Sequence, residues 1–451
     1  MTTTTTTTNG VSPSEDDLKD ALKTLRSEHP TLGISKIHAA LLADHPEWTV
    51  SEKRTRKILQ SEGLVISSGT GPTSASGKNG FKYPSSKLME GLDLGQWTKK
   101  VEVKFFDKKK GKGLVAKERI SEGETIWKED PFILAPEWDI YDLQIKSGSC
   151  MHCSTSLAGS SLVKRCADSL SSGSTLCPAH FCNHLCRERS NKTHPLLCPS
   201  QNPASTPLLS FAQQKEWMAL HALAQCTARV LLAAQGDGKD FAKDWEVVKS
   251  LAQLGMEERH AQVSAAEPDR ATWKKAFQLY EQAFREPTQA SEKKKLARLL
   301  RKPIPQEVVD ELFNYDAFLR NLGRMSLNLE AHGGLYVLHS HINHACSPNT
   351  SIRHFDTRTA LSRITVVAKK DIEVNEELVI TYVNPDPRRM DRQRQLDEWG
   401  FGQCRCARCE QEKKDEAKLL TNGERHTSAV AAAEPVGDDL EKELKASFGV
   451  F

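Results

Sequence analysis

The chain has 451 residues, enough for two to four domains and one sizeable core, and its composition is 38% hydrophobic and 27% charged. A net charge of only +3 excludes a polycation, and without a run of about 18 apolar residues we expect no membrane span. The first ten residues lack the basic start and apolar stretch of a secretory signal, so the twelve cysteines favour a reducing compartment and metal binding over disulfides.

The first hundred residues predict a small helical module between flexible segments. A threonine run makes residues 1–13 a disordered N-terminus, and residues 14–66 predict three short helices, the first of them capped by Ser14. Residues 67–100 are expected to be a linker, because they begin with a stretch rich in Ser, Gly and Thr. The third helix has a basic polar side, formed by Lys53, Arg54, Arg56 and Lys57. This side suits a contact with nucleic acid or chromatin, although a solvated face of an unrelated interaction module is the more common reason for such charge.

The rest of the chain changes character several times. Its predicted segments are 101–145 (strand-like), 146–200 (a cysteine-dense insert), 206–330 (a mainly helical insert), 331–385 (strand-like), 386–411 (cysteine-rich) and 412–451 (a charged tail). Alternation of apolar residues distinguishes the strand-like parts from the helical ones, which show apolar spacing of three and four residues.

The cysteine-dense insert predicts two tetrahedral zinc sites. Its eight candidate ligands are Cys150, Cys153, Cys166, Cys177, Cys182, Cys186, His194 and Cys198. Short spacings suit zinc, because neighbouring ligands must converge at about 2.3 Å from one ion. The insert has few apolar residues, so metal binding would also supply its folding energy. The spacing leaves open which ligands share an ion, and three further histidines are possible substitutes: His152, His180 and His184.

A third zinc site is expected near the end of the cysteine-rich segment. Cys404, Cys406 and Cys409 supply three thiols, and Cys346 would complete a tetrahedral set. Four thiolates leave no open coordination position, so this zinc would be structural and would tie the C-terminal segment to the loop around Cys346. Cys226 lies in helical apolar sequence and is expected to be an ordinary core thiol.

Four motifs resemble those of SET-domain methyltransferases, in the order that this family shows. They are GKGL at residues 111–114, NHACSPN at 343–349, NEELVITYV at 375–383 and FGQCRCARC at 401–409. Over residues 100–411 the chain most resembles fungal SET proteins related to the SMYD (SET and MYND) class. This resemblance implies an α+β fold, a SET β-clip of small sheets split by a MYND-like zinc insert, with an N-terminal helical module and a helical insert. The first part of the SET domain, its catalytic core and a post-SET zinc segment would then be 101–145, 331–385 and 386–411.

The insert is similar to a MYND finger, in which pairs of ligands interleave. The resemblance implies two ligand sets, namely Cys150, Cys153, Cys182 and Cys186 on one zinc, and Cys166, Cys177, His194 and Cys198 on the other. The family normally has a tight Cys-x2-Cys in its middle, whereas ten residues separate Cys166 from Cys177 here. Cys177 with His180 is therefore the first alternative pair.

The resemblance also implies the residues that carry the activity. A SET enzyme binds S-adenosylmethionine on one face and takes a target lysine from the other, and Tyr382 matches its catalytic tyrosine. The residues at cofactor-binding positions are Lys110, Gly111, Lys112, Gly113, Ser340, Asn343, His344, Tyr382 and Phe401. Tyr336 and Trp399 are expected to line the lysine channel. Without the motif, Tyr382 would be interpreted as core packing, the usual role of an aromatic residue in a strand.

These patterns together predict an S-adenosylmethionine-dependent protein-lysine N-methyltransferase that holds three zinc ions and acts on a basic tail such as that of a histone. The alternatives are a non-catalytic zinc scaffold and a DNA-binding chromatin regulator that uses the third helix. The combination of Tyr382 with Asn343 and His344 favours the enzyme. The expected partners are a histone tail and, at the N-terminal helices, chromatin or nucleic acid, without membrane contact. The expected locations are nucleus and cytoplasm.

Overall fold

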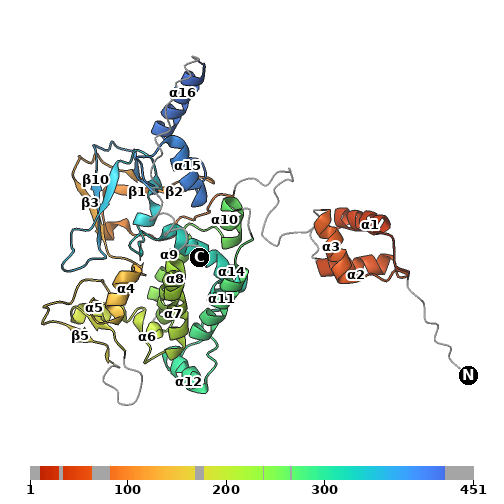
Figure 1. Cartoon of the computed structure of the whole chain (residues 1–451), viewed down its shortest axis with the longest axis horizontal. Coiled ribbons are helices and arrows are strands. Elements are labelled where there is room, and N and C mark those ends of the chain that lie inside the picture. Colours follow the sequence, from red (N-terminus) through yellow and green to blue (C-terminus); the bar gives the residue numbers. More distant parts are fainter. Residues whose placement is uncertain are drawn as a thin grey trace, which may run out of the picture. The chain divides into compact units, whose positions relative to one another are not determined.

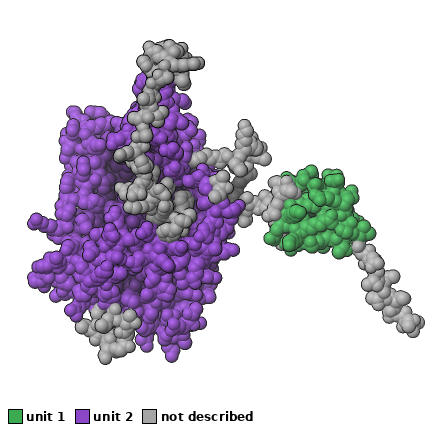
Figure 2. Space-filling view, viewed as in Figure 1, with its two compact units in different colours: residues 1–79 green, residues 80–451 purple. Residues whose placement is uncertain are grey.

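The computed structural model describes residues 11–29, 34–62, 82–167, 177–236, 238–264 and 267–421. The chain divides into two compact units, residues 1–79 and 80–451 (Figure 2). Most of the predicted disordered N-terminus, the linker up to residue 81 and most of the charged tail lie outside the described residues. Within the described part, no helix has the length and apolar character needed to span a membrane.

The first unit is built from three helices. They are α1 (Glu15–Glu28), α2 (Ile34–Asp44) and α3 (Glu52–Ser61). Ser14 caps α1 because its hydroxyl oxygen accepts a hydrogen bond from the backbone N–H of Asp17 at 3.1 Å. Apolar residues at helical spacing form the core of the unit: Leu18, Leu22, Leu25, Ile37, Leu41, Ile58 and Leu59.

Only part of the predicted basic side of α3 is exposed to solvent. Arg54 turns back onto its own unit, where its guanidinium donates to the Ser12 hydroxyl and to the Pro13 carbonyl, each at 2.9 Å. Lys53 and Lys57 are exposed. Part of the charge therefore serves the fold of this unit, and the rest faces solvent.

Two small sheets lie at one end of the second unit, beside the helices (Figure 1). The first sheet has the order β1–β2–β11–β8, with β1 (Val101–Asp107), β2 (Gly111–Ala116), β11 (Glu377–Ile380) and β8 (Asn343–His344). The second has the order β3–β10–β9, with β3 (Thr125–Glu129), β10 (Ile364–Ala368) and β9 (Thr350–Arg353). The parallel pair β8–β11 places Val379 opposite Asn343 and Ile380 opposite His344. It brings the two motif segments at residues 343–349 and 375–383 side by side.

The helices of the second unit surround a large apolar core. Their bounds are α7 (Thr206–Gln214), α8 (Met218–Ala233), α9 (Lys239–Ser250), α10 (Met256–Val263), α11 (Arg270–Phe284), α12 (Ala290–Leu299), α13 (Gln306–Leu312) and α14 (Tyr315–Asn328). The central helix α8 is apolar on nearly every side, because it packs against α7, α9, α11 and α14 (Figure 1). The same core includes the two-stranded pair of β4 (Ile133–Leu134) and β7 (Gly334–Leu335), so the helices and the strands form one body.

The cysteine-dense insert is made of short elements without a large apolar core. They are α4 (Trp138–Ile145), β5 (Lys164–Arg165), β6 (His180–Phe181), α5 (His184–Ser190) and α6 (His194–Leu197). Its buried cluster consists mainly of cysteines, joined by Leu157, Ala179 and Phe181. Such a segment needs another source of stability, which supports the prediction that metal binding folds it.

Two segments differ from the simple picture of linkers and tails. Ser85 and Gln253 exchange two backbone hydrogen bonds of 2.9 and 2.8 Å, so the described end of the predicted linker, residues 82–100, packs onto the second unit. After the sheets, α15 (Arg389–Glu398) and α16 (Ala407–Thr421) follow, and α16 begins inside the cysteine-rich segment. Composition marked these stretches as polar, but polar sequence can still pair its backbone with a neighbour.

Candidate active site and zinc centres

The best-defined metal group combines residues from two distant segments. The sulfurs of Cys346, Cys404, Cys406 and Cys409 all lie within 4.8 Å of one another. Sulfurs that are about 2.3 Å from a tetrahedral zinc lie about 3.8 Å apart, by simple geometry. The separation of Cys346 and Cys409 is 3.5 Å, so the set fits a zinc ion. It is the set that the sequence predicted, and we call it the third group.

Neighbouring side chains hold the third group in place. Gln393 on α15 donates to the Cys404 carbonyl at 2.9 Å, accepts from the Cys404 N–H at 2.7 Å, and donates to the Cys409 sulfur at 3.4 Å. Arg392 is fully buried and donates to the same sulfur at 3.5 Å. Four thiolates around one zinc ion carry a net negative charge, which these donors and the Arg392 cation offset.

His344 joins the third group to Tyr382. Its Nδ1 accepts a hydrogen bond from the backbone N–H of Tyr382 at 3.0 Å, and its Nε2 lies 3.3 Å from the Cys346 sulfur. Because Nδ1 accepts, the proton of the neutral ring is on Nε2, which donates to the sulfur. A ligand of the third group thus fixes the ring, and the ring fixes the backbone of Tyr382.

Asn343 connects the early glycine turn to β11. Its Nδ2 donates to the Lys112 carbonyl at 3.0 Å and to Glu377 Oε1 at 2.9 Å. A Cβ on Gly113 would lie only 2.7 Å from that nitrogen and 2.5 Å from the Phe106 ring, so a larger residue would displace the Asn343 and Phe106 side chains. The main chain of β2, β8 and β11 is therefore held in one register at this point.

A cavity of about 270 Å³ lies directly beside Tyr382. Its wall comes from the start of α8, the end of α14, the segment before β8, the end of β11 and the segment after α15. The lining residues are Met218, Ala219, Ser326, Leu327, Asn328, Leu329, Glu330, Ala331, His339, Ser340, Ile342, Ile380, Thr381, Tyr382, Trp399 and Phe401. The Tyr382 hydroxyl donates to the Ile342 carbonyl at 2.6 Å, and its ring lies 4.8 Å from that of Phe401. We call this space the Tyr382 cavity.

The Tyr382 cavity contains a neutral phenol, that of Tyr382, and an acidic side chain, that of Glu330. Burial raises the pKa of Tyr382 well above its ordinary value, so the hydroxyl keeps its proton and remains a donor. Glu330 is the acidic residue of the described lining, and its Oε1 lies 3.1 Å from His339 Nε2. The backbone N–H groups of Leu338 and His339 donate to the buried Glu129, and burial raises the pKa of that carboxyl to about 7.

The residues predicted from the sequence fall into three places. Ser340, Tyr382, Trp399 and Phe401 line the Tyr382 cavity, whereas Gly113 and Asn343 lie at the neighbouring strand contact. Lys110 pairs with Glu377 and is half exposed, and Gly111 has a positive φ of 72° at the same turn. Whether these residues bind the cofactor stays a prediction.

Two predicted residues have other partners in this structure. Lys112 is buried and donates from Nζ to the Ser250 carbonyl at 2.9 Å, and burial lowers its pKa to about 7. Tyr336 is fully buried beneath the strands, where its hydroxyl donates to the Ser362 carbonyl and lies 2.7 Å from His332 Nε2. Tyr336 is not among the residues that line the Tyr382 cavity.

Several residues of the cavity carried no signal in the sequence. Asn328, Glu330 and His339 line it, yet none belongs to a motif quoted above. Asn328 is held by its Nδ2, which donates to the Ala252 carbonyl at 2.8 Å. Their positions depend on how α14 meets the strands, and local sequence patterns do not report such tertiary contacts.

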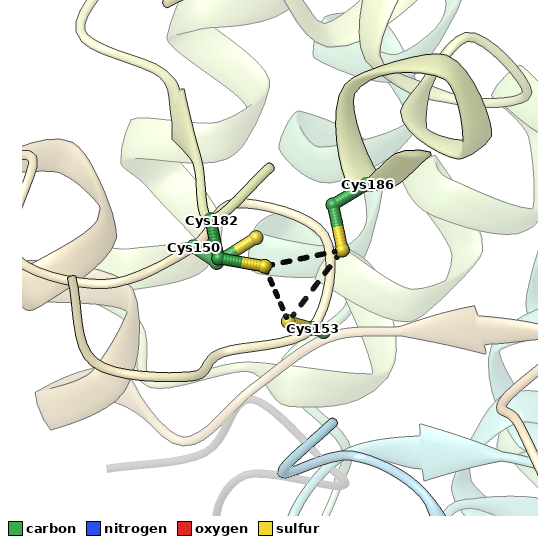
Figure 3. Close-up of side chains that lie close together, drawn as sticks. All are labelled: Cys150, Cys153, Cys182 and Cys186. Atoms are coloured by element: carbon green, nitrogen blue, oxygen red, sulfur yellow. Dashed lines mark hydrogen bonds between the residues drawn. The ribbon is translucent and has the colours of Figure 1, made fainter. Parts of the chain in front are cut away.

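The insert contributes two further metal groups. Cys150, Cys153, Cys182 and Cys186 form the first group, which Figure 3 shows converging on one point, and Cys166, Cys177, His194 and Cys198 form the second. In the first, Cys182 and Cys153 lie 3.4 and 3.8 Å from Cys186, and in the second His194 Nε2 lies 3.4 Å from Cys166. These distances fit the values of about 3.8 Å and about 3.6 Å that tetrahedral zinc geometry requires. The described alternatives His152, His180 and His184 belong to neither group.

The residues around the Tyr382 cavity are suited to aligning two bound molecules rather than to attacking one of them as a nucleophile. A protonated phenol, two further aromatic rings and backbone carbonyls surround the Tyr382 cavity, and the nearby thiols are all committed to a closed four-ligand group. This arrangement suits a direct transfer between two bound molecules that are held in line.

Comparison with known proteins agrees with this arrangement. The family model of the SET domain matches residues 240–383. Histone-lysine N-methyltransferase SET5 of Scheffersomyces stipitis is 28% identical over 96% of this chain and 88% of its own length. The SET5 protein of Yarrowia lipolytica is 29% identical over 86% of this chain and 80% of its own length. A crystal structure of the SET domain of LSMT bound to lysine and AdoHcy is similar with a TM-score of 0.32 and 11% identity, covering 67% of this chain and 52% of that one. The family-model match therefore indicates a SET domain within residues 240–383.

Proposed function

We propose that this SET-domain protein-lysine methyltransferase, which is similar to fungal SET5 proteins along most of its length, methylates histone lysines. The observation that carries the proposal is the position of Tyr382. It lies in an aromatic cavity, held by His344 on its backbone and by the Ile342 carbonyl at its hydroxyl. The activity for which these relatives are named, histone-lysine methylation, supports the choice of substrate.

The residues of the cavity suit the demands of this reaction. S-adenosylmethionine supplies a methyl group on a sulfonium, and the predicted positions for holding it include Asn343, Ser340 and Phe401. The lysine nitrogen uses its lone pair to form the new N–C bond, so it must arrive deprotonated and in line with the breaking S–C bond. The half-buried Tyr382 ring and Trp399 exclude water from that path, while Glu330 offers a carboxylate to a cationic side chain before it loses its proton.

The first experiment measures binding and transfer with the zinc-replete full chain. We expect S-adenosylmethionine to bind in isothermal titration and its labelled methyl group to appear on core histones. Transfer to other basic proteins but not to histones would contradict the substrate class alone. Failure of a folded, zinc-replete sample to bind S-adenosylmethionine would contradict the enzyme itself.

The second experiment tests the role of Tyr382. We expect Tyr382→Phe to lower kcat by about a hundredfold or more while the cofactor affinity changes little, because the lost hydroxyl orients the reacting groups. The matched control is Tyr83→Phe, which removes a hydroxyl outside the residues that line the cavity. Unchanged turnover of Tyr382→Phe would show that this hydroxyl has no catalytic role.

We also propose finer features of the protein. The interleaved ligand sets of the insert support a MYND-like finger with two zinc ions. The exposed Lys53 and Lys57 of α3 support a contact of the first unit with nucleic acid or chromatin, and action on histones would place the protein in the nucleus, with the cytoplasm as a second location. A salt-dependent shift of a DNA duplex by residues 1–79, lost in Lys53→Glu/Lys57→Glu, would test the contact, and imaging of the tagged chain would test the location.

A further inference from the structure

A second and larger cavity lies away from Tyr382, where the insert meets the rest of the second unit. Its volume is about 620 Å³, within the range of about 300–1,000 Å³ that is common for ligand sites. Residues from the insert, from the segment around β4, from α7 and α8 and from the loop at 359–363 line it. We call it the insert cavity. It borders both metal groups of the insert, because Cys153, Cys186, Cys177 and His194 are part of its wall.

The charged side chains of the insert cavity are mostly cationic. Among its described lining residues are four cations, namely Arg189, Lys192, Arg229 and Arg363, and one carboxylate, that of Asp130. Arg363 and Arg189 both approach Asp130, at 2.7 and 3.6 Å, and Arg363 also lies 3.7 Å from Asp356. Arg189 is about half exposed (47%) at this point, so its positive charge is accessible to a ligand.

One helix separates the insert cavity from the Tyr382 cavity. His221, Gln225 and Arg229 follow one another at intervals of four residues along α8 and line the insert cavity. Met218 and Ala219, on the same helix, line the Tyr382 cavity instead. The two cavities therefore share α8 as a wall and are lined by different residues of it.

His221 is a polar group without a partner at this wall. It is 98% buried, and among the described residues its Nδ1 has no hydrogen-bond partner, while Nε2 lies 3.3 Å from the Gln225 amide. A buried polar atom normally has a partner, so an unpaired nitrogen beside a cavity indicates room for a ligand group or an ordered water. Arg229 is different, because it is already held by Asp244 at 2.8 Å and by the Phe132 carbonyl at 2.6 Å.

Part of the remaining surface of the insert cavity is apolar. The side chains that form it are Phe132, Ile133, Leu134, Tyr141, Leu197 and Leu209. An apolar wall beside a cationic opening binds ligands that combine carboxylates with aliphatic or aromatic groups. The basic protein substrate of the methyltransferase has the same sign of charge as this opening and would be repelled here.

From these features we infer that the insert cavity is a docking site for an acidic peptide segment of a partner protein, with carboxylates on Arg189 and Arg363 and an apolar side chain against Phe132 and Leu197. Charge complementarity chooses this occupant. The insert then recruits a protein partner while the Tyr382 cavity serves the basic substrate, and the two ligands do not compete.

The test uses the zinc-replete full chain and a fluorescent eight-residue peptide that alternates Glu with Leu. We expect binding in fluorescence anisotropy, with at least tenfold weaker binding for the same peptide with Gln in place of Glu. Arg189→Glu and Arg363→Glu should each weaken the binding of the Glu–Leu peptide at least tenfold. Lys164→Glu, an exposed lysine of β5 that does not line the cavity, should leave the affinity unchanged.

Three readouts keep the outcomes distinct. Zinc content and S-adenosylmethionine affinity should be unchanged in Arg189→Glu, whose side chain is half exposed, so a folding defect would be visible as such. Equal binding of the Gln peptide, or binding that both Arg variants leave intact, would overturn the proposal. Stronger binding of a small dicarboxylate such as glutarate, or of a single-stranded oligonucleotide, would overturn the peptide as the occupant. A rise in the apparent KM for the histone substrate on adding the Glu–Leu peptide would overturn the separation of the two sites.

Discussion

Replacing His344 by alanine tests whether the third group positions the active site. The ring accepts the Tyr382 N–H through Nδ1 and donates from Nε2 to the Cys346 sulfur. Without the ring, the partly buried backbone N–H of Tyr382 loses its hydrogen-bond acceptor, which lowers the free energy of unfolding by about 1–3 kcal/mol. The sulfur also loses a donor, and loss of such an outer contact typically weakens metal affinity by about 10–100-fold.

The assay is zinc release to a coloured chelator, followed beside thermal unfolding. The wild type should release zinc from three groups, and in His344→Ala one of the phases should become about 10–100-fold faster while the other two are unchanged. His354→Ala is a matched control, because that ring contacts the Leu361 carbonyl at 2.8 Å and no residue of the third group. If His344→Ala releases zinc and unfolds as the wild type does, then the ring does not connect the metal group to Tyr382.

Other substitutions have equally direct expectations. Gly113→Ala should lower S-adenosylmethionine affinity and destabilise the fold by about 1–3 kcal/mol, because a Cβ would lie 2.7 Å from Asn343 Nδ2; unchanged titration and melting would contradict this. Gln393→Leu should lower the free energy of unfolding in urea by about 2 kcal/mol and speed zinc release, because the N–H and C=O of Cys404 both lose their hydrogen-bond partner. Gln235→Leu, at an exposed contact with Lys302, is the control. Burial lowers the pKa of His221 from its ordinary value of 6.5 to about 4. As the pH falls below 6.5, the imidazole therefore binds a proton in the unfolded chain before it does so in the folded chain. The contribution of neutral His221 to the free energy of unfolding is complete above pH 6.5, and about 3 kcal/mol of it is lost as the pH falls towards 4. His221→Gln should remove that part of the pH dependence. The same dependence of the free energy of unfolding on pH in both proteins would refute the assignment.

The metal groups were the most predictable part of the molecule. A thiol has few roles in a reducing compartment, so twelve candidate ligands with short spacings restrict the possible arrangements strongly. Even the distant partner Cys346 could be assigned, because three neighbouring cysteines lacked a fourth ligand. The helices of the first unit were predictable for a different reason, since caps such as Ser14 and regular apolar spacing are local signals.

The walls of the two cavities were not predictable in the same way. Tyr336 belongs to the segment before Asn343, yet a hydrogen bond to the Ser362 carbonyl holds it in the core instead of at the cavity. Glu330, just after α14, lines the same cavity as Ile380 of β11, although these residues are fifty positions apart. Burial of Lys112 against Ser250 likewise depends on how α9 approaches β2. Such placements follow from packing, for which a single sequence carries no local pattern.

The order of the metal ligands along the chain has a consequence for biosynthesis. Both metal groups of the insert are complete once residue 198 has been made, so that part can load zinc while the ribosome is still translating the helices. The third group instead needs Cys409, about sixty residues after Cys346, and synthesis at about 5–20 residues per second imposes a delay of several seconds. A nascent chain therefore completes both ligand sets of its insert before the ligand set that lies next to Tyr382.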